Sequence, residues 1–215
     1  APLARLELAI LLRTFAAHNV MEDHGSIIAQ GKDGTAPHNH GTDDDILREG
    51  ASIVVDIFPR EPGGGYFFDI TRTLCVGKAT PRLREVYADV KEALLTALGA
   101  LKVGERCYDY QARTCDLFEK KGYATIRQDS RITSGYVHGL GHGVRLDIHE
   151  APSLGGSSVN PDVLAPGHLF TVEPGLYLPE DKVAVRLEDI VWIHPDGTPE
   201  NITTYPYDLE VFPQG

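Results

Sequence analysis

The chain has 215 residues, of which 42% are hydrophobic and 24% are charged, and its formal net charge is −11. This composition is typical of a globular domain and excludes collagen, coiled coil and intrinsic disorder. The length fits a single core without room for a second full domain. A strongly acidic protein repels phosphate groups, so nucleic-acid and membrane partners are not expected.

The three cysteines, Cys75, Cys107 and Cys115, are odd in number and form no Cys-x-x-Cys pair. We therefore expect no disulfide framework and a reducing, cytoplasmic location. Cys107 and Cys115 are expected to be half-buried packing groups rather than nucleophiles, because no histidine lies near them in the sequence.

The N-terminal half predicts one helix and then strands. Apolar spacing indicates a helix over 3–18. Runs of β-branched and aromatic residues over 52–58 and 66–76 predict two strands, and the glycine-rich segment 61–65 between them predicts an antiparallel hairpin with a long loop.

The second half opens with helices. Thr80, followed by proline, predicts the start of a helix over 80–101, and a second helix is predicted over 108–121, ended by Gly122. Short strands follow to the C-terminus, including one over 170–177. The predicted fold class is α+β, with an antiparallel sheet covered by helices.

The chain also shows a faint internal repeat. A helix, a histidine-containing loop and a strand with a carboxylate occur in order before Asp56 and again before Glu173. Two helices open the second half but only one opens the first. Residues 1–215 are therefore expected to form one domain that lacks a first helix of roughly 25 residues, and any N-terminal domain, upstream of Ala1.

Four carboxylates interrupt hydrophobic, strand-like segments: Asp56 in IVVDIFP, Asp69 in YFFDITRT, Glu173 in FTVEPGLY and Glu188 in VRLEDIV. His142 lies in a fifth motif, HGLGHGVRLDIHE. Any one acid could face solvent by strand alternation. Because burying a carboxylate is costly unless it is paired or binds a metal, four of them together with a histidine indicate a shared site.

Two divalent ions would account for this set. Four carboxylates balance about four positive charges, and carboxylates can bridge two ions ~3.5–4 Å apart. A set rich in oxygen ligands with one imidazole suits manganese or cobalt better than a thiolate site, and zinc also fits.

The five motifs, in this order, resemble the pita-bread metallopeptidases, specifically the aminopeptidase P and prolidase branch, over residues 6–191. The resemblance implies a pita-bread fold of two pseudo-two-fold halves. It implies a dinuclear exopeptidase that hydrolyses the Xaa-Pro bond of a proline-containing peptide, as an Xaa-Pro dipeptidase or aminopeptidase, with a homodimer allowed. The implied metal ligands are Asp56, Asp69, His142, Glu173 and Glu188, with Asp69 and Glu188 bridging the ions.

The resemblance also implies roles around the metals. Glu173 would be the general base, and His138 and His149 would bind the scissile carbonyl and the oxyanion. Arg186 matches the substrate-binding arginine beside the bridging glutamate.

The substrate-facing histidine of the Pro-His loop corresponds to His38 or His40, and its spacing to Asp56 favours His38.

Two features depart from the family pattern. Asp56 and Asp69 are thirteen residues apart, slightly more than in the common form. Arg145 stands where the family usually has glycine. If 143–149 is extended, Arg145 shares a face with His149 and binds the free carboxylate of a dipeptide; otherwise it faces solvent.

Three alternatives stay open at this point: a methionine aminopeptidase, a metal-free binding module like the histone-chaperone branch, and a creatinase-like enzyme. Methionine aminopeptidases do not usually carry the histidine at position 138, and the other two branches lose the ligand set. The remaining histidines and an acidic run lack metal-like spacing and are expected at the surface or as capping groups: His18, His24, His168, His194 and 43–45.

Overall fold

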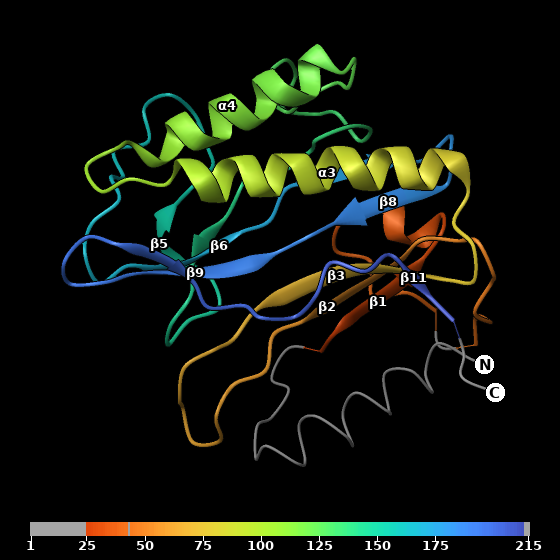
Figure 1. Ribbon diagram of the computed structural model, residues 1–215, viewed down its shortest axis with the longest axis horizontal. Helices are drawn as coiled ribbons and strands as arrows, with labels where there is room; N and C mark the ends of the chain where they lie inside the picture. Colours follow the sequence, from red (N-terminus) through yellow and green to blue (C-terminus); the bar gives the residue numbers. More distant parts are fainter. Residues whose placement is uncertain (1–24, 43, 213–215) are drawn as a thin grey trace.

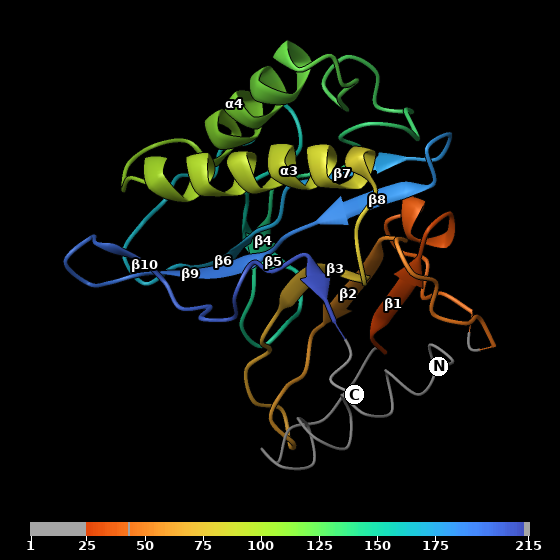
Figure 2. The same ribbon diagram turned by 45° about the vertical axis from the view of Figure 1, so that its right-hand side comes forward.

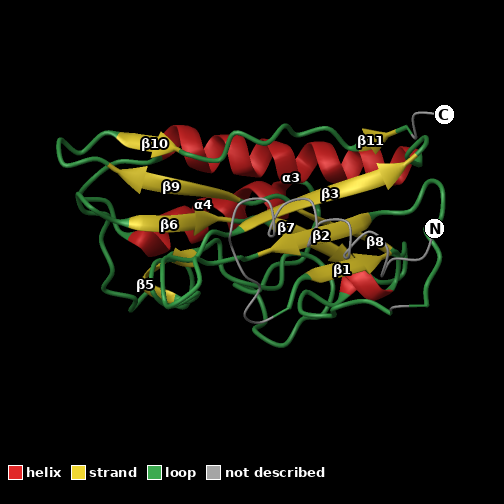
Figure 3. Cartoon of the chain, turned by 90° about the horizontal axis from the view of Figure 1, so that it is seen from below, coloured by secondary structure: helices red, strands yellow, loops and turns green. Residues whose placement is uncertain are grey.

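The computed structural model describes residues 25–42 and 44–212, so the predicted helix over 3–18, His18, His24 and Asp43 lie outside the described residues. Two helices, α3 (Pro81–Ala100) and α4 (Cys107–Lys120), cover the sheets from one side (Figures 1 and 2). Seen from below, strands from the first half of the chain lie beside those from the second half (Figure 3). Within the described residues, no helix is long and apolar enough to cross a membrane.

The first sheet has the order β1-β2-β3-β11. Its strands are β1 (Ile27–Gln30), β2 (Ile53–Ile57), β3 (Ile70–Val76) and β11 (Glu210–Val211), and the 3-10 helix η2 (Asp33–Thr35) follows β1. β2 and β3 pair antiparallel with Asp56 opposite Thr71, which confirms the predicted hairpin. β1 pairs antiparallel with β2, whereas β11 pairs parallel with β3.

The second sheet has the order β10-β9-β6-β4-β5, and β7 and β8 form a separate antiparallel pair. The strands are β4 (His142–Gly143), β5 (Glu150–Ser153), β6 (Leu169–Val172), β7 (Gly175–Leu178), β8 (Val183–Arg186), β9 (Asp189–Ile193) and β10 (Pro199–Asn201). The single strand predicted over 170–177 is therefore wrong. It breaks at Glu173-Pro174, because proline has no N–H to donate to a sheet, and its two parts join different sheets.

Both predicted helices are confirmed. α3 (Pro81–Ala100) begins at Thr80, whose hydroxyl accepts a hydrogen bond from the Leu83 N–H over 3.2 Å. α4 (Cys107–Lys120) is followed by Gly122 in the left-handed region, with φ of 87°. Their buried faces pack on the sheets and form the main core, which confirms the α+β class with antiparallel sheets covered by helices. Cys75, Cys107 and Cys115 are unpaired and fully buried. The half-buried state predicted for Cys107 and Cys115 is therefore wrong, because both are fully buried in the core.

Candidate metal centre and catalytic cavity

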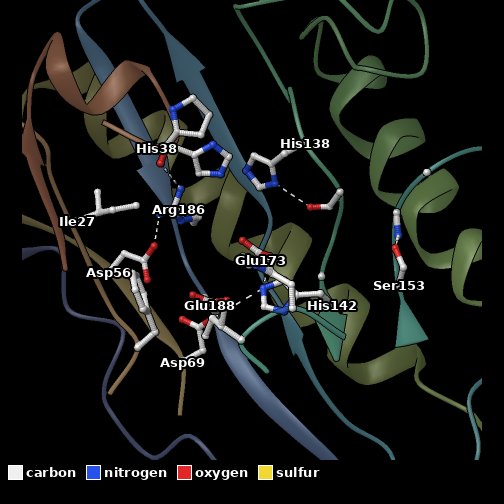
Figure 4. A pocket seen from close by; sticks show the side chains of 18 of the residues that line it. Ile27, His38, Asp56, Asp69, His138, His142, Ser153, Glu173, Arg186 and Glu188 are labelled. Carbon is white, nitrogen blue, oxygen red and sulfur yellow. Dashed lines mark hydrogen bonds and ion pairs between the residues drawn. The ribbon is translucent and has the colours of Figure 1, made fainter. Parts of the chain in front are cut away.

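The main cavity has a volume of about 600 Å³ and lies where the two halves of the fold meet. Figure 4 shows acidic side chains on one side of it and the imidazoles of His38 and His138 on another. Nearly every predicted site residue lines this cavity: His38, His40, Asp56, Asp69, His138, His142, His149, Glu173, Arg186 and Glu188. The structure therefore brings together side chains from five separate sequence motifs.

The four acids lie within or at the ends of strands. Asp56 is inside β2, and Asp69 directly precedes β3. Glu173 lies in the break between β6 and β7, and Glu188 in the break between β8 and β9. Glu173 is held there by its N–H, which donates to the carbonyl oxygen of Leu140 over 2.7 Å. The breaks let Glu173 and Glu188 face the cavity, which regular alternation along one strand would not ensure.

The donor set fits divalent metal ions. One ligand atom each from Asp69, His142 and Glu188 lies within 4.8 Å of the others. Asp56 Oδ1, Asp69 Oδ1 and Glu188 Oε1 are buried and have no hydrogen-bond partner in the described part of the chain. A buried carboxylate oxygen without a partner is costly, and a bound cation would remove that cost. These residues would hold hard, oxygen-preferring ions.

Burial and mutual repulsion favour the protonated forms of Asp56, Asp69 and Glu188 in the absence of metal. Burial, followed by repulsion from Glu188 and Asp56, raises the pKa of Asp69 well above its ordinary value. Burial, followed by repulsion from Glu173 and Asp56, raises the pKa of Glu188 to about 8. Burial also raises the pKa of Asp56, although Arg186 opposes the rise. This clustering of like charges is the electrostatic environment expected of a cation site.

His142 and Glu173 form the contact at the centre of the cluster. His142 Nε2 lies 3.3 Å from Glu173 Oε1 and 3.8 Å from Asp69 Oδ2. His142 Nδ1 donates to the Gly143 carbonyl over 3.2 Å, which directs Nε2 toward the acids. Burial disfavours the charged form of each residue, but their mutual attraction outweighs burial. Glu173 and Glu188 raise the pKa of His142 to about 9. His142 in turn lowers the pKa of Glu173 to about 2.

Arg186 is buried beside Asp56. Its Nη2 lies 2.5 Å from Asp56 Oδ2, and Nη1 donates to the hydroxyl of Tyr177 over 2.8 Å and to the carbonyl of Pro37 over 3.1 Å. Its Nε donates to the Thr71 hydroxyl over 3.1 Å. The guanidinium is thus engaged by protein groups and orients Asp56 and Tyr177; a direct contact with substrate remains a prediction.

Both ring nitrogens of His138 are engaged as well. Nδ1 lies 2.7 Å from the Gly139 carbonyl oxygen, which can only accept, so Nδ1 carries the proton. Burial lowers the pKa of His138, so the ring is neutral and Nε2 accepts from the Tyr177 hydroxyl over 3.0 Å. This tautomer follows from the hydrogen-bond network. A direct hydrogen bond from Nε2 to substrate would require exchange of that tyrosine partner.

The other histidines differ in how firmly they are held. His149 stacks edge-on against His142 with ring centroids 4.3 Å apart, and burial together with that neighbour lowers the pKa of His149. His40 Nδ1 donates to the carbonyl of Ser26 over 2.9 Å. His38 lies close enough to His138 and His149 to add a small contribution to the lowering of their pKa values. Both His38 and His40 line the cavity, so the alternative between them stays a prediction.

Arg145 is not among the residues that line the cavity. Its side chain is 52% exposed, and its guanidinium forms an ion pair with Glu150. The extended conformation assumed for 143–149 is wrong, because β4 ends at Gly143 and the chain bends from Arg145 to His149. Binding a substrate carboxylate would require Arg145 to leave Glu150.

Two contributors were missed in the sequence. Tyr177 is fully buried, and its hydroxyl joins His138 to Arg186. The Thr71 hydroxyl donates to Glu188 Oε2 over 2.7 Å. Both residues lie inside the motifs already singled out, where a buried hydroxyl needing a partner was the available signal. Outside the cavity, His168 accepts from the Ala165 N–H and His194 pairs with Glu200, as expected of capping and surface groups.

The chain is similar to several peptidases. A probable dipeptidase, PepE, of Mycobacterium tuberculosis is 34% identical over 187 residues, which cover 87% of this chain and 46% of that protein. An Xaa-Pro dipeptidase of Pyrococcus furiosus is 35% identical over 172 residues, which cover 80% of this chain and 45% of that protein. The solved structure of an Xaa-Pro dipeptidase from Bacillus anthracis matches with a TM-score of 0.84 at 30% identity, covering 99% of this chain and 55% of that one.

These matches bear on the predicted fold and family. The chain spans about half the length of the curated relatives it matches. The structural neighbours have the pita-bread fold that the motifs led us to expect. The sequence model of metallopeptidase family M24 matches residues 4–195, and this range contains all five motifs and the four clustered acids. The chain therefore belongs to metallopeptidase family M24.

Proposed function

We propose that this chain forms the catalytic domain of a dinuclear metallo-exopeptidase that hydrolyses the bond preceding proline, as an Xaa-Pro dipeptidase or aminopeptidase. One observation carries the proposal: three buried carboxylates, the half-buried Glu173 and one imidazole face a single cavity, and each buried acid has an oxygen without a hydrogen-bond partner among the described residues. Asp56, Asp69, His142, Glu173 and Glu188 would hold the ions. Divalent ions held there would activate water and polarise the scissile carbonyl.

The chain's own residues supply proton transfer and orientation. Glu173 is the proposed general base, because its carboxylate faces the cavity beside His142. Contact with charged His142 lowers the pKa of Glu173 to about 2 in the absence of metal, but His142 would be neutral as a metal ligand and would no longer hold the pKa of Glu173 that low. His149 lies against His142 in the cavity wall and is placed to contact the carbonyl region of a bound peptide. His138 would act there after exchanging its Tyr177 partner.

Specificity for proline follows from the chemistry of the bond. An Xaa-Pro amide has no N–H, so a wall that offers no acceptor at that point costs this substrate nothing. An ordinary peptide would leave a buried N–H without a partner, which is unfavourable.

Three finer assignments belong to the same proposal. Manganese is the preferred ion, with cobalt or zinc as substitutes, because four of the five ligands are carboxylates. The unpaired, buried cysteines support a reducing compartment, and hence the cytoplasm. A homodimer is proposed and is checked by light scattering on the purified chain.

The test is hydrolysis by the chain after chelation and reloading with manganese. Xaa-Pro and Xaa-Pro-Yaa peptides should be cleaved and Met-Ala should not, with Asp69→Asn as the inactive control. Cleavage of Met-Ala in preference to Xaa-Pro would indicate a methionine aminopeptidase. Absence of all hydrolysis with metal bound would leave a binding role.

A further inference from the structure

Helix α4 carries a buried polar side chain, Gln111, that contacts the segment bearing His138. Gln111 is 3% exposed and is not among the residues that line the main cavity. Its Nε2 donates to the carbonyl oxygen of His138 over 3.2 Å, and its Oε1 accepts from the hydroxyl of Tyr136 over 2.7 Å. Both ends of one amide are therefore used on a single short segment.

The two partners of Gln111 act on the same imidazole. The ring of Tyr136 lies edge-on to that of His138, with centroids 5.6 Å apart and planes at 70°. Tyr136 is fully buried, so its hydroxyl needs the partner that Gln111 provides. On another side, Tyr177 contacts the same imidazole and is held by Arg186. Gln111 thus fixes one of the two tyrosines, and the backbone, that set the ring's orientation.

The metal ligands are attached to the fold independently of Gln111. Two residues after His138, the Leu140 N–H donates to the carbonyl of Leu154 over 3.2 Å, and the Leu140 carbonyl accepts from the N–H of Glu173 over 2.7 Å. These bonds anchor the approach to the metal centre. Loss of the Gln111 amide should therefore shift His138 and leave Glu173 in place.

We propose that Gln111 is a positioning residue that holds His138 in its working orientation at the substrate cavity. It touches neither substrate nor metal and acts through the His138 carbonyl and the Tyr136 ring. This inference rests on the proposed function, in which His138 acts on the bound peptide. A purely structural role, in which Gln111 only satisfies buried polar groups, predicts a loss of stability without a specific effect on His138.

A double-mutant cycle separates the two roles. Gln111→Leu removes both hydrogen bonds and should lower kcat/KM on an Xaa-Pro dipeptide by roughly fivefold or more, since one net hydrogen bond corresponds to about that factor. In the His138→Ala background the same change should cost nothing further, because the residue it positions is absent. Thr114→Val is the matched control: its side chain is buried in α4, and its hydroxyl donates to the carbonyl of Tyr110 in the same helix, so kcat/KM should not change.

A second variant gives a readout that a structural role would not move. In Gln111→Glu, the protonated carboxyl has the donor and acceptor of the amide, whereas the ionised form has no donor for the His138 carbonyl. Burial raises the pKa of such a carboxyl into the working range. At low pH the kcat/KM of Gln111→Glu should match that of wild type. As pH rises, kcat/KM should fall with an additional apparent pKa that neither wild type nor Gln111→Leu shows.

Ring-nitrogen NMR of His138 in the zinc-loaded chain tests the idea without activity. The Nδ1–H signal, assigned by its loss in His138→Ala, should shift in Gln111→Leu and not in Thr114→Val. An unshifted signal, or equal losses of kcat/KM in both backgrounds, would overturn the positioning role. If the wild-type chain cleaves no Xaa-Pro peptide, the proposed function fails, and the NMR result still decides whether Gln111 orients His138.

Discussion

The guanidinium of Arg186 lies 2.5 Å from the carboxylate of Asp56, and the two side chains are only 4% and 11% exposed. The contact joins β8 to β2 at the wall of the cavity and gives Asp56 Oδ2 a partner, while Oδ1 has none in the described part of the chain. A buried pair of this kind is sensitive to removal of one partner, because the remaining charge is left without compensation.

Arg186→Met should therefore destabilise the chelated chain by about 3–5 kcal/mol in urea unfolding. Manganese should reduce that loss, because a bound cation would compensate Asp56. Arg145→Met is the control: it breaks the exposed pair with Glu150 and should cost about 0–1 kcal/mol. Similar losses in the two variants would show that the buried pair contributes no more than a surface one.

Chelation of the wild-type chain should lower its melting temperature. Without cations, Asp56, Asp69 and Glu188 keep buried oxygens that have no partner in the described part of the chain, and burial with like-charge repulsion raises their pKa values. Manganese or cobalt should restore the melting temperature by binding the folded state, in a concentration-dependent way. A melting curve unchanged by thorough chelation would contradict the metal centre.

The stability of the chelated chain should rise as pH falls from about 9 to 7. The folded pKa of Glu188, about 8, lies above its ordinary 4.5, and that of His142, about 9, lies above 6.5. Each group thus binds its proton more tightly when folded, and this stabilisation is lost as pH rises through the folded pKa. His138 and His149 have lowered pKa values and oppose the trend only at lower pH. Urea midpoints across this range measure the slope, which should be smaller with manganese bound.

Glu173→Gln should lower kcat by at least ~10²-fold, because it removes the proton acceptor while keeping the shape of the side chain. Metal content is measured in parallel, since Glu173 is also a proposed ligand. Glu180→Gln, on the exposed turn after β7, is the control and should leave kcat unchanged. Near wild-type turnover in Glu173→Gln would assign the general base to another group.

The sequence is enough to predict which residue types form the site, because several carboxylates within apolar strands indicate one common metal site. The sequence did not reveal which groups hold them. Arg186 contacts Asp56, although the two residues are 130 positions apart in the sequence. Gln111 contacts His138 from helix α4. Such contacts depend on how the halves pack. Pro174 has no backbone N–H and so indicates a break in the strand. The hydrophobic residues on both sides of it nevertheless favour one continuous strand in the sequence-based prediction.

Arg145 gives the sharpest test of substrate length. The guanidinium is paired with Glu150 outside the lining of the cavity, so it can bind the carboxylate of a dipeptide only by exchanging partners. Glu150→Gln removes the competitor, and because exposed pairs are worth about 0–1 kcal/mol, it should raise the dipeptide-to-tripeptide ratio of kcat/KM by up to ~5-fold. Arg145→Gly should lower the same ratio by about tenfold through loss of a charge-assisted contact. A ratio that is the same in both variants and in wild type would place Arg145 at the surface, with no part in choosing the substrate.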